Sequence, residues 1–330
     1  MIADYVKRMF RGKPLGRVAF NMRPVQGPWG GASVFTRQLM QVLARCGFDV
    51  RFDLKKPADI LFVIDPRIEE PLRTFGTDDI VAYKKQHPNV KVLHRVNECD
   101  QRKGSDFMDR RLEEINAVSD LTVFISEWLK DYFTARWFDA SRPHTVIYNG
   151  SDPAFFHPIG NQPYDGNGPL RVVTHHWSDN PMKGFPAYKQ LDDLIADGKI
   201  DGFELWIIGR WPVDITWRVA KTFPPTHDQA LADLLRQCHL YITASLWEPC
   251  GAHHVEGAQC GLPLLYHADG GGIVEAGRRY GMPFRDDLPT VIEEARRAYG
   301  LLRQRVLTDA PNGELMCLQY LRAIYQMLSQ

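Results

Sequence analysis

Short apolar runs alternate with stretches of helix length along almost the whole chain, and this alternation limits the fold more than any other feature. In the first half, four runs are typical of buried strands: residues 17–21, 60–64, 90–95 and 121–125. A helix is predicted over residues 34–46, ending at Gly47. Strands that alternate with helices predict parallel sheets covered by helices, so we expect an α/β fold whose first half is doubly wound and Rossmann-like.

The second half repeats this pattern, with strand-like runs at residues 170–174, 203–208, 240–243 and 262–266. Between residues 149 and 169, four Pro, four Gly and three Asn interrupt any helical period. A further helix is predicted over residues 313–329, after a Pro-Asn-Gly break that frees it to pack elsewhere. We therefore expect a first domain over 1–157, a second Rossmann-like domain over 158–309, and a segment over 310–330 whose helix packs on the first domain.

The composition favours a folded protein that acts on a small or weakly charged substrate. The chain has 330 residues, of which 44% are hydrophobic, enough for two cores. Forty basic residues balance forty acidic ones, so the net charge gives no reason to expect nucleic acid as a partner. Six cysteines occur without a CxxC pair, which is typical of free thiols in a reducing compartment. We expect a cytoplasmic protein.

The first eleven residues have an amphipathic pattern of their own. Apolar side chains fall on one helical stripe and basic side chains lie off it, with Ile2, Tyr5, Met9, Lys7 and Arg8 as examples. Two interpretations fit this pattern: a helix docked on the protein itself, which we prefer, and a basic helix that makes a peripheral contact with a membrane surface.

Two glutamates mark the segment that follows the predicted strand at 240–243. Glu248 lies at the carboxyl end of that strand, and Glu256 lies eight residues later on the following helix. Ligands of open α/β folds bind at the carboxyl ends of the strands, so both carboxylates are placed for ligand contact. Two glutamates on a helical segment would otherwise be a solvated face.

This segment resembles the hallmark of the retaining family-four glycosyltransferases of GT-B fold, in which seven residues separate two glutamates and a Gly-x-Pro turn follows, here Gly261 to Pro263. Further matches come in the order that the family uses: residues 146–152, Lys183-Gly184, residues 207–209 and residues 270–275. The resemblance implies two doubly wound domains facing a central cleft, and transfer of a sugar from a nucleoside-diphosphate sugar to a hydroxyl with retention of configuration.

The resemblance also implies roles for donor-binding residues. Glu256 would accept hydrogen bonds from the ribose hydroxyls, and Glu248 would hold the donor sugar. A diphosphate needs cations or the N–H groups of a helix N-terminus. The backbone of Cys250, Gly251 and Ala252 would supply such N–H groups at the start of a helix.

Lys183 would neutralise the diphosphate leaving group and so act in catalysis. In this family an arginine commonly precedes that lysine, and this sequence lacks it. His175, His176 or Arg210, which follows Gly209 at the end of a strand, would then take its place; looser phosphate binding is the alternative.

In the first half, Gly30 and Gly31 follow a strand and open a helix, where a loop could approach phosphate, although a plain tight turn has the same pattern. Asn97 and Asp100 follow the strand that contains His94 and are candidates for the reaction centre, whereas His94 itself is interpreted as a core residue.

A competing hypothesis assigns zinc to four residues with no standard spacing: Cys250, His253, His254 and Cys260. We prefer a metal-independent transfer without a cofactor, because the Asp-x-Asp motif of metal-dependent glycosyltransferases does not occur. The expected partners are the nucleotide-sugar donor and a hydroxyl acceptor, a glycan or another molecule. A nucleotide-sugar epimerase of GT-B shape and a catalytically silent nucleotide-sugar-binding protein are the alternatives.

Overall fold

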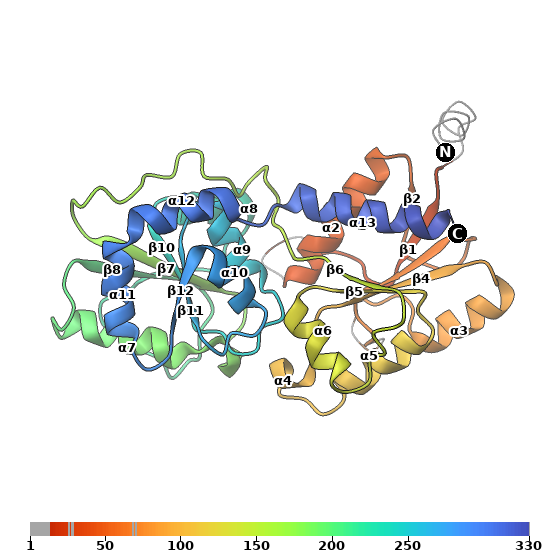
Figure 1. Cartoon of the computed structure of the whole chain (residues 1–330), viewed down its shortest axis with the longest axis horizontal. Helices are drawn as coiled ribbons and strands as arrows, with labels where there is room; N and C mark the ends of the chain where they lie inside the picture. The colour runs from red at the N-terminus through yellow and green to blue at the C-terminus, as the bar shows by residue number, and fades with distance from the viewer. Residues whose placement is uncertain (1–13, 26, 28–29, 68, 70, 330) are drawn as a thin grey trace. The chain divides into compact units, whose positions relative to one another are not determined.

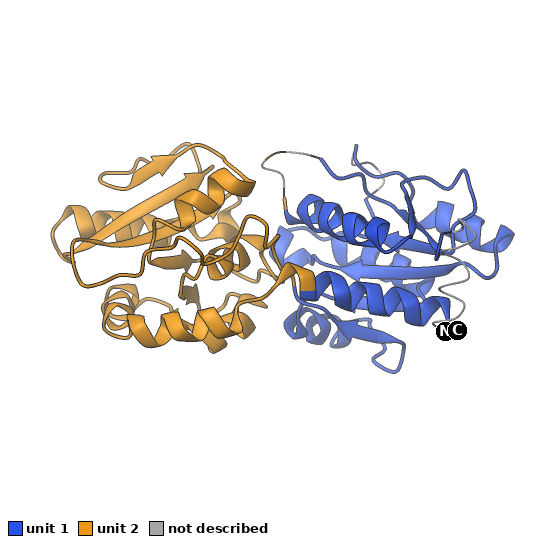
Figure 2. Ribbon diagram, turned by 90° about the horizontal axis from the view of Figure 1, so that it is seen from above, with its two compact units in different colours: residues 1–26, 31–148, 315–330 blue, residues 27–30, 149–314 orange. Residues whose placement is uncertain are grey.

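The computed structural model describes residues 14–25, 27, 30–67, 69 and 71–329. The chain divides into two compact units, coloured separately in Figure 2: the first contains residues 1–26, 31–148 and 315–330, and the second contains residues 27–30 and 149–314. The sequence pattern predicts the junctions after residues 157 and 309. The amphipathic segment 1–11 lies outside the described residues.

The first unit is built on a six-stranded parallel sheet in the order β2-β1-β3-β4-β5-β6 (Figure 1). Its strands are β1 (Arg17–Phe20), β2 (Asp49–Arg51), β3 (Ile60–Val63), β4 (Lys91–Val96), β5 (Leu121–Phe124) and β6 (His144–Val146). The helices between them are α2 (Gly31–Arg45), α3 (Thr77–Gln86), α4 (Asp100–Lys103), α5 (Met108–Ala117) and α6 (Glu127–Thr134). All neighbouring strands of this sheet pair in parallel, as the alternating sequence pattern predicts.

The second unit repeats this plan with strand order β12-β11-β10-β7-β8-β9. Its strands are β7 (Leu170–His176), β8 (Phe203–Gly209), β9 (Lys221–Phe223), β10 (Leu240–Thr243), β11 (Leu264–His267) and β12 (Gly281–Phe284). Its helices are α7 (Phe185–Ala196), α8 (Asp228–Leu235), α9 (Ala252–Gln259), α10 (Ile273–Tyr280), α11 (Leu288–Arg297) and α12 (Tyr299–Asp309), with a 3-10 turn, η1, at Pro181–Lys183.

Alternate residues of β8 show why the second sheet is covered on both faces. Leu205 and Ile207 pack into a core formed with α7 and α11, whereas Trp206 and Ile208 pack into a second core formed with α8, α9 and α10. Successive side chains of a strand point to opposite faces, so a continuous apolar run needs a helical layer on each side. The α/β expectation is confirmed for both sheets.

The last helix, α13 (Gly313–Leu328), leaves the second unit and packs in the first (Figure 1). Met316, Tyr320 and Ile324 are buried in the same core as Phe35 of α2 and Phe62 of β3. The rings of Tyr320 and Phe35 meet edge to face, with centroids 4.9 Å apart. The first unit thus has a covering helix from the far end of the chain. Within the described residues, no helix combines the length and apolar character needed to cross a bilayer.

Candidate active site

Lys183 and Glu248 form an ion pair at the carboxyl edge of the second sheet. Lys183 Nζ lies 3.0 Å from Glu248 Oε2, and the two side chains are 15% and 14% exposed. The contact depends on Gly184, whose φ is +73° and whose Cα approaches the end of β10 so closely that a Cβ would lie 2.1 Å from the Ala244 carbonyl oxygen. Glycine therefore lets η1, with Lys183 at its end, lie against the loop that carries Glu248.

The loop that carries Glu248 is held in a constrained conformation. Trp247 has a φ of +49°, an unfavourable value for a bulky residue. Its N–H donates to the Asp269 carbonyl at 2.9 Å, and the Glu248 carbonyl accepts from Gly272 N–H at 3.0 Å. A Cβ on Gly271 would lie 2.9 Å from the carbonyl carbon of Trp247. The Gly-Gly-Gly stretch at 270–272 thus packs against the backbone of the Glu248 loop. Backbone strain such as the positive φ of Trp247 is concentrated at functional sites.

Glu256 lies on α9 and contacts the end of β7. Its Oε2 is 2.7 Å from Nε2 of His175, and the two side chains are 6% and 0% exposed. Nδ1 of the same imidazole is 3.0 Å from the hydroxyl of Tyr241 on β10. A carboxylate buried to this extent needs a hydrogen-bond donor, and His175 supplies one. The sequence suggested His175 as a phosphate ligand, but both of its ring nitrogens have partners inside the unit.

His176 points to the opposite face of β7 and is also enclosed. Its Nε2 lies 3.0 Å from the Tyr188 hydroxyl and 3.1 Å from Thr174 Oγ1. Gly209, at the end of β8, has a φ of +111°, and a Cβ there would lie 2.0 Å from the His176 carbonyl oxygen. Glycine at position 209 therefore permits close backbone approach between β7 and β8.

Arg210 is exposed, in contrast to the two histidines. One of its terminal guanidinium nitrogens donates to the Trp177 carbonyl at 2.8 Å. It lines a pocket of about 790 Å³ whose other lining residues are Gly30, Trp177, Ser178, Asp179, Gly209, Trp211 and Val213. Residues 27–30 belong to the second unit, so the pocket lies within that unit. Sequence reasoning missed Trp177 and Trp211, although both follow the carboxyl ends of buried strands.

Helix α9 begins at Ala252, with Gly251 as its N-cap. The Cys250 carbonyl accepts a hydrogen bond from Asn149 Nδ2 at 2.6 Å, which ties the segment before the helix to residue 149 of the same unit. The N–H groups of the first turn lack carbonyl partners of their own within a helix, as at any helix N-terminus. This places Gly251 and Ala252 at an anion-favouring position beside the Glu248 loop.

Four histidine rings, His175, His176, His253 and His254, lie close together behind these groups, with centroids of adjacent rings 5.1 to 6.2 Å apart. His253 Nε2 is 3.0 Å from Thr243 Oγ1, and neither ring nitrogen of His254 has a hydrogen-bond partner among the described residues. Burial lowers the pKa of His254 to about 4. No three His, Cys, Asp or Glu side chains of the described residues, Cys250, His253, His254 and Cys260 included, are placed to hold a metal ion together.

In the first unit, the two residues suggested for the reaction centre make contacts that organise the sheet edge. With its amide oriented to satisfy its neighbours, Asn97 donates to the Ile64 carbonyl at 2.9 Å and accepts from Arg95 at 3.2 Å. Asp100 starts α4, and its carboxylate accepts from Ser105 Oγ and from the N–H groups of residues 108 and 109. Both side chains therefore link segments of the first unit.

His94 and Gly31 have structural positions. His94 is fully buried, and burial lowers its pKa to about 3, in agreement with its interpretation as a core histidine. Gly31 is the first residue of α2. The two glycines suggested for a phosphate-binding loop are thus divided between the units, since Gly30 lines the pocket of the second.

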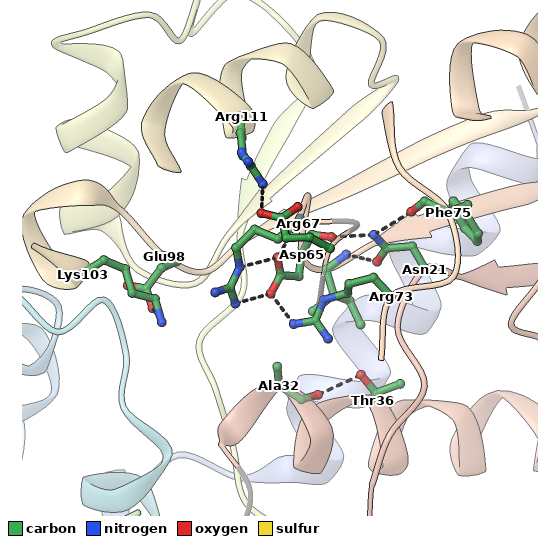
Figure 3. A network of polar contacts seen from close by, with 12 residues as sticks. Asn21, Ala32, Thr36, Asp65, Arg67, Arg73, Phe75, Glu98, Lys103 and Arg111 are labelled. Carbon is green, nitrogen blue, oxygen red and sulfur yellow. Dashed lines mark hydrogen bonds and ion pairs between the residues drawn. The ribbon is translucent and has the colours of Figure 1, made fainter. Parts of the chain in front are cut away.

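A polar network that sequence reasoning missed occupies the carboxyl edge of the first sheet (Figure 3). Asp65 follows β3, and its carboxylate accepts hydrogen bonds from both Arg67 and Arg73, whose guanidiniums turn toward it in Figure 3. Asn21, which follows β1, donates to the Asp65 carbonyl at 2.6 Å. Burial raises the pKa of Asp65, but the two arginines outweigh it and lower the pKa to about 2.

No protein-family model and no curated protein matches this chain. Solved structures do resemble it at low sequence identity. Sucrose-phosphate synthase from Thermosynechococcus elongatus is 16% identical with a TM-score of 0.69, and the match covers 95% of this chain and 99% of that one.

HepE from Anabaena, solved in complex with UDP-glucose, is 13% identical with a TM-score of 0.67, covering 94% of this chain and 100% of that one. A glycosyltransferase from Rickettsia africae is 14% identical with a TM-score of 0.65, covering 95% and 99%. The likeness extends over nearly the full length of these proteins, and the chain therefore has their GT-B fold.

Proposed function

We propose that the protein is a glycosyltransferase that moves a sugar from a nucleoside-diphosphate sugar to an acceptor hydroxyl with retention of anomeric configuration. The observation that carries this proposal is the convergence of two carboxylates and one lysine at a single sheet edge. Lys183 contacts Glu248, and Glu256 lies on the helix whose N-terminus follows the Glu248 loop. The motif order in the sequence and the fold shared with UDP-sugar-binding proteins support the same assignment.

In this proposal Lys183 carries the positive charge that stabilises the departing diphosphate, and Glu248 holds the donor sugar at the reacting carbon. The N–H groups at Gly251 and Ala252 add to the stabilisation of negative charge. Glu256 binds the ribose hydroxyls. Asn97 and Asp100 receive no catalytic step, since their side chains link segments of the first unit.

Arg210 is the residue that we assign in place of the absent family arginine. His175 is fully buried and His176 is 2% exposed, so neither reaches a ligand without rearrangement of the sheet. Arg210 is exposed beside Trp177 and Trp211 in the pocket. Its delocalised cation suits a phosphate oxygen, and the indole rings suit a nucleobase.

The test is turnover with a panel of nucleotide sugars. Thermal shift identifies the donor first, because a ligand at about 100 times its dissociation constant adds about 2.7 kcal/mol to folding stability. The expected result is donor consumption only when a hydroxyl acceptor is present, with a product of the same anomeric configuration by NMR. Conversion of the donor without acceptor would instead show an epimerase, binding without any turnover would show a silent binding protein, and an inverted product would refute retention.

A further inference from the structure

We propose that Tyr241 and His175 form a hydrogen-bonded relay that positions the Glu256 carboxylate. One carboxylate oxygen bonds to His175, and the other is left to accept a hydrogen bond from a ribose hydroxyl. In this relay Tyr241 and His175 are positioning residues, since neither touches the ligand. The inference rests on the proposed role of Glu256 in ribose binding and adds to it a determinant of selectivity for ribonucleotides over 2′-deoxyribonucleotides.

The relay is a continuous chain of short contacts across three elements. Tyr241 on β10 lies 3.0 Å from His175 Nδ1, and His175 Nε2 on β7 lies 2.7 Å from Glu256 Oε2 on α9. The first two residues are fully buried and the Glu256 side chain is 6% exposed. The second carboxylate oxygen, Oε1, accepts no hydrogen bond from the described residues. It is the oxygen that remains for a ligand.

The hydrogen-bond geometry assigns the protons. The backbone N–H of His175 donates to the Tyr241 hydroxyl oxygen at 3.1 Å, so the hydroxyl proton is left to donate elsewhere. Nδ1 of His175 is 3.0 Å away, whereas the alternative acceptor, the His175 carbonyl, is 3.5 Å away. The shorter contact is the better hydrogen bond. Nδ1 is thus an acceptor, which places the ring proton on Nε2, directed at Glu256.

The packing around Tyr241 holds the relay in place. Burial raises the pKa of Tyr241 well above its usual value, so the phenol keeps its proton. Residue 257, next to Glu256, is a glycine, and a Cβ there would lie 2.4 Å from the Tyr241 ring. Helix α9 therefore approaches β10 closely enough for Glu256 to reach His175 only because Gly257 has no side chain.

A carboxylate fixed by one donor discriminates between ligands more sharply than a mobile one. Oε1 has a defined position and gains a hydrogen bond only if the ligand brings a hydroxyl to that position. A 2′-deoxyribose brings one hydroxyl fewer and leaves a buried anionic oxygen with a missing partner. Without His175 the carboxylate can rotate, so selectivity for ribose should decline together with affinity.

The test compares His175→Phe, His175→Gln and Tyr241→Phe with the unmodified full-length protein. The probes are UDP, ADP and GDP, each with its 2′-deoxy counterpart, and the measurement is binding by calorimetry. His175→Phe should weaken ribonucleotide binding by roughly tenfold and bring the ribo-to-deoxy affinity ratio close to one. His175→Gln keeps an N–H donor and should retain affinity within roughly threefold. Tyr241→Phe should fall between the two.

His239→Asn is the matched control, because His239 is also buried but bonds the backbone N–H of Arg171 far from Glu256, a bond that an Asn oxygen can replace. It should leave affinity and the affinity ratio unchanged. Imidazole nitrogen-15 NMR gives a readout that does not depend on ligand. The signals lost in His175→Gln should show a ring with its proton on Nε2 and none on Nδ1.

The outcomes separate this inference from the proposed function. If Glu256→Gln weakens nucleotide binding but all His175 and Tyr241 variants keep the affinity ratio, the relay is refuted and the role of Glu256 stands. If Glu256→Gln binds ribonucleotides as tightly as the unmodified protein, the role of Glu256 is itself wrong, and the inference is overturned with it. A ring protonated at Nδ1 also overturns the relay, even where His175→Phe and Tyr241→Phe fail to fold.

Discussion

Replacing each of the two glutamates by glutamine should separate their roles, and the Lys183–Glu248 pair makes the prediction quantitative. At 3.0 Å the attraction between the two charges amounts to about 5.5 kcal/mol for an effective dielectric constant of about 20. Desolvation cancels most of this, so the net contribution of such a pair is only about 1–3 kcal/mol. A bound diphosphate must compete with Glu248 for contact with Lys183, or it is repelled by the negative charge of Glu248.

Glu248→Gln removes that competition. We therefore expect free nucleoside diphosphate to bind about 1–2 kcal/mol more tightly, a factor of roughly 5 to 30. Turnover should nevertheless fall by roughly a hundredfold, because the carboxylate no longer stabilises the positive charge that builds on the anomeric carbon. A variant that binds product more tightly and reacts more slowly would fit a group that acts in the transition state.

Glu256→Gln should have the opposite effect. Losing the charge-assisted hydrogen bond to ribose weakens nucleotide and donor alike by about 1.5–3 kcal/mol, while turnover at saturating donor changes little. Calorimetric titration with nucleoside diphosphate and initial rates of donor consumption measure both quantities. Lys183→Met, made alone and in each glutamine variant, completes a double-mutant cycle for nucleotide binding. The coupling energy should have the sign opposite to that of an attractive contact with the donor.

Glu293→Gln is the control, since Glu293 pairs with Arg296 on α11 and has no assigned role in the site. It should change neither affinity nor rate. Weaker diphosphate binding by Glu248→Gln, combined with unchanged affinity in Glu256→Gln, would show that the two roles are wrongly assigned. Turnover by Glu248→Gln equal to that of the unmodified protein would refute its part in the reaction.

Donor binding and turnover should persist in excess EDTA, because Lys183, Arg210 and the start of α9 are assigned to the diphosphate; a loss of rate restored by magnesium or manganese would contradict this. Asp65→Asn should destabilise the protein by about 2 kcal/mol at pH 7, because the pKa of Asp65 is lowered to about 2 in the folded state. The ionised carboxylate contributes this stability fully above about pH 4 and loses it toward pH 2. Urea unfolding should therefore show a smaller stability difference between variant and unmodified protein at pH 3. His254→Leu should stabilise the protein by about 2 kcal/mol more at pH 5 than at pH 7.5. The folded-state pKa of His254, about 4, lies below the usual value, so at pH 5 the unfolded chain binds a proton that the folded protein does not, and this favours unfolding of the unmodified protein. Equal effects of the substitution at both pH values would contradict this. Deleting residues 1–11 should lower the melting temperature more than it changes co-sedimentation with anionic vesicles, and full-length protein that sediments only when that segment is present would support a membrane contact instead.

The sequence predicts the central strands well and misses the edge strands for one physical reason. The apolar runs at 17–21, 60–64, 90–95 and 121–125 became β1, β3, β4 and β5, within one residue at each end. The four strands that were not predicted, β2, β6, β9 and β12, are the outermost strands of the two sheets. Three of them have three residues each, and all are partly exposed. They lack the continuous apolar run of a strand buried on both faces.

Site residues show a similar division. Short sequence motifs that follow strands contain Lys183, Glu248 and Glu256. Their placement at a sheet edge could therefore be predicted from strand order. The contact between His175 and Glu256 joins residues 81 positions apart on different elements, and side-chain pairing of that kind depends on the packing of α9 on β10. Asp65 directly follows a buried strand, which was the available signal for the network in the first unit.

The packing of α13 has a consequence for synthesis of the chain. The second unit is nearly continuous in sequence, from residue 149 to residue 314, whereas the first waits for residues 315–330 to supply one wall of its core. During synthesis, all but four residues of the second unit therefore emerge from the ribosome in one continuous stretch. Phe35 and Phe62 of the first unit lack their contact with Tyr320 until α13 has been made. A stop codon just before α13 would damage the first unit, although most of that unit is made before the second.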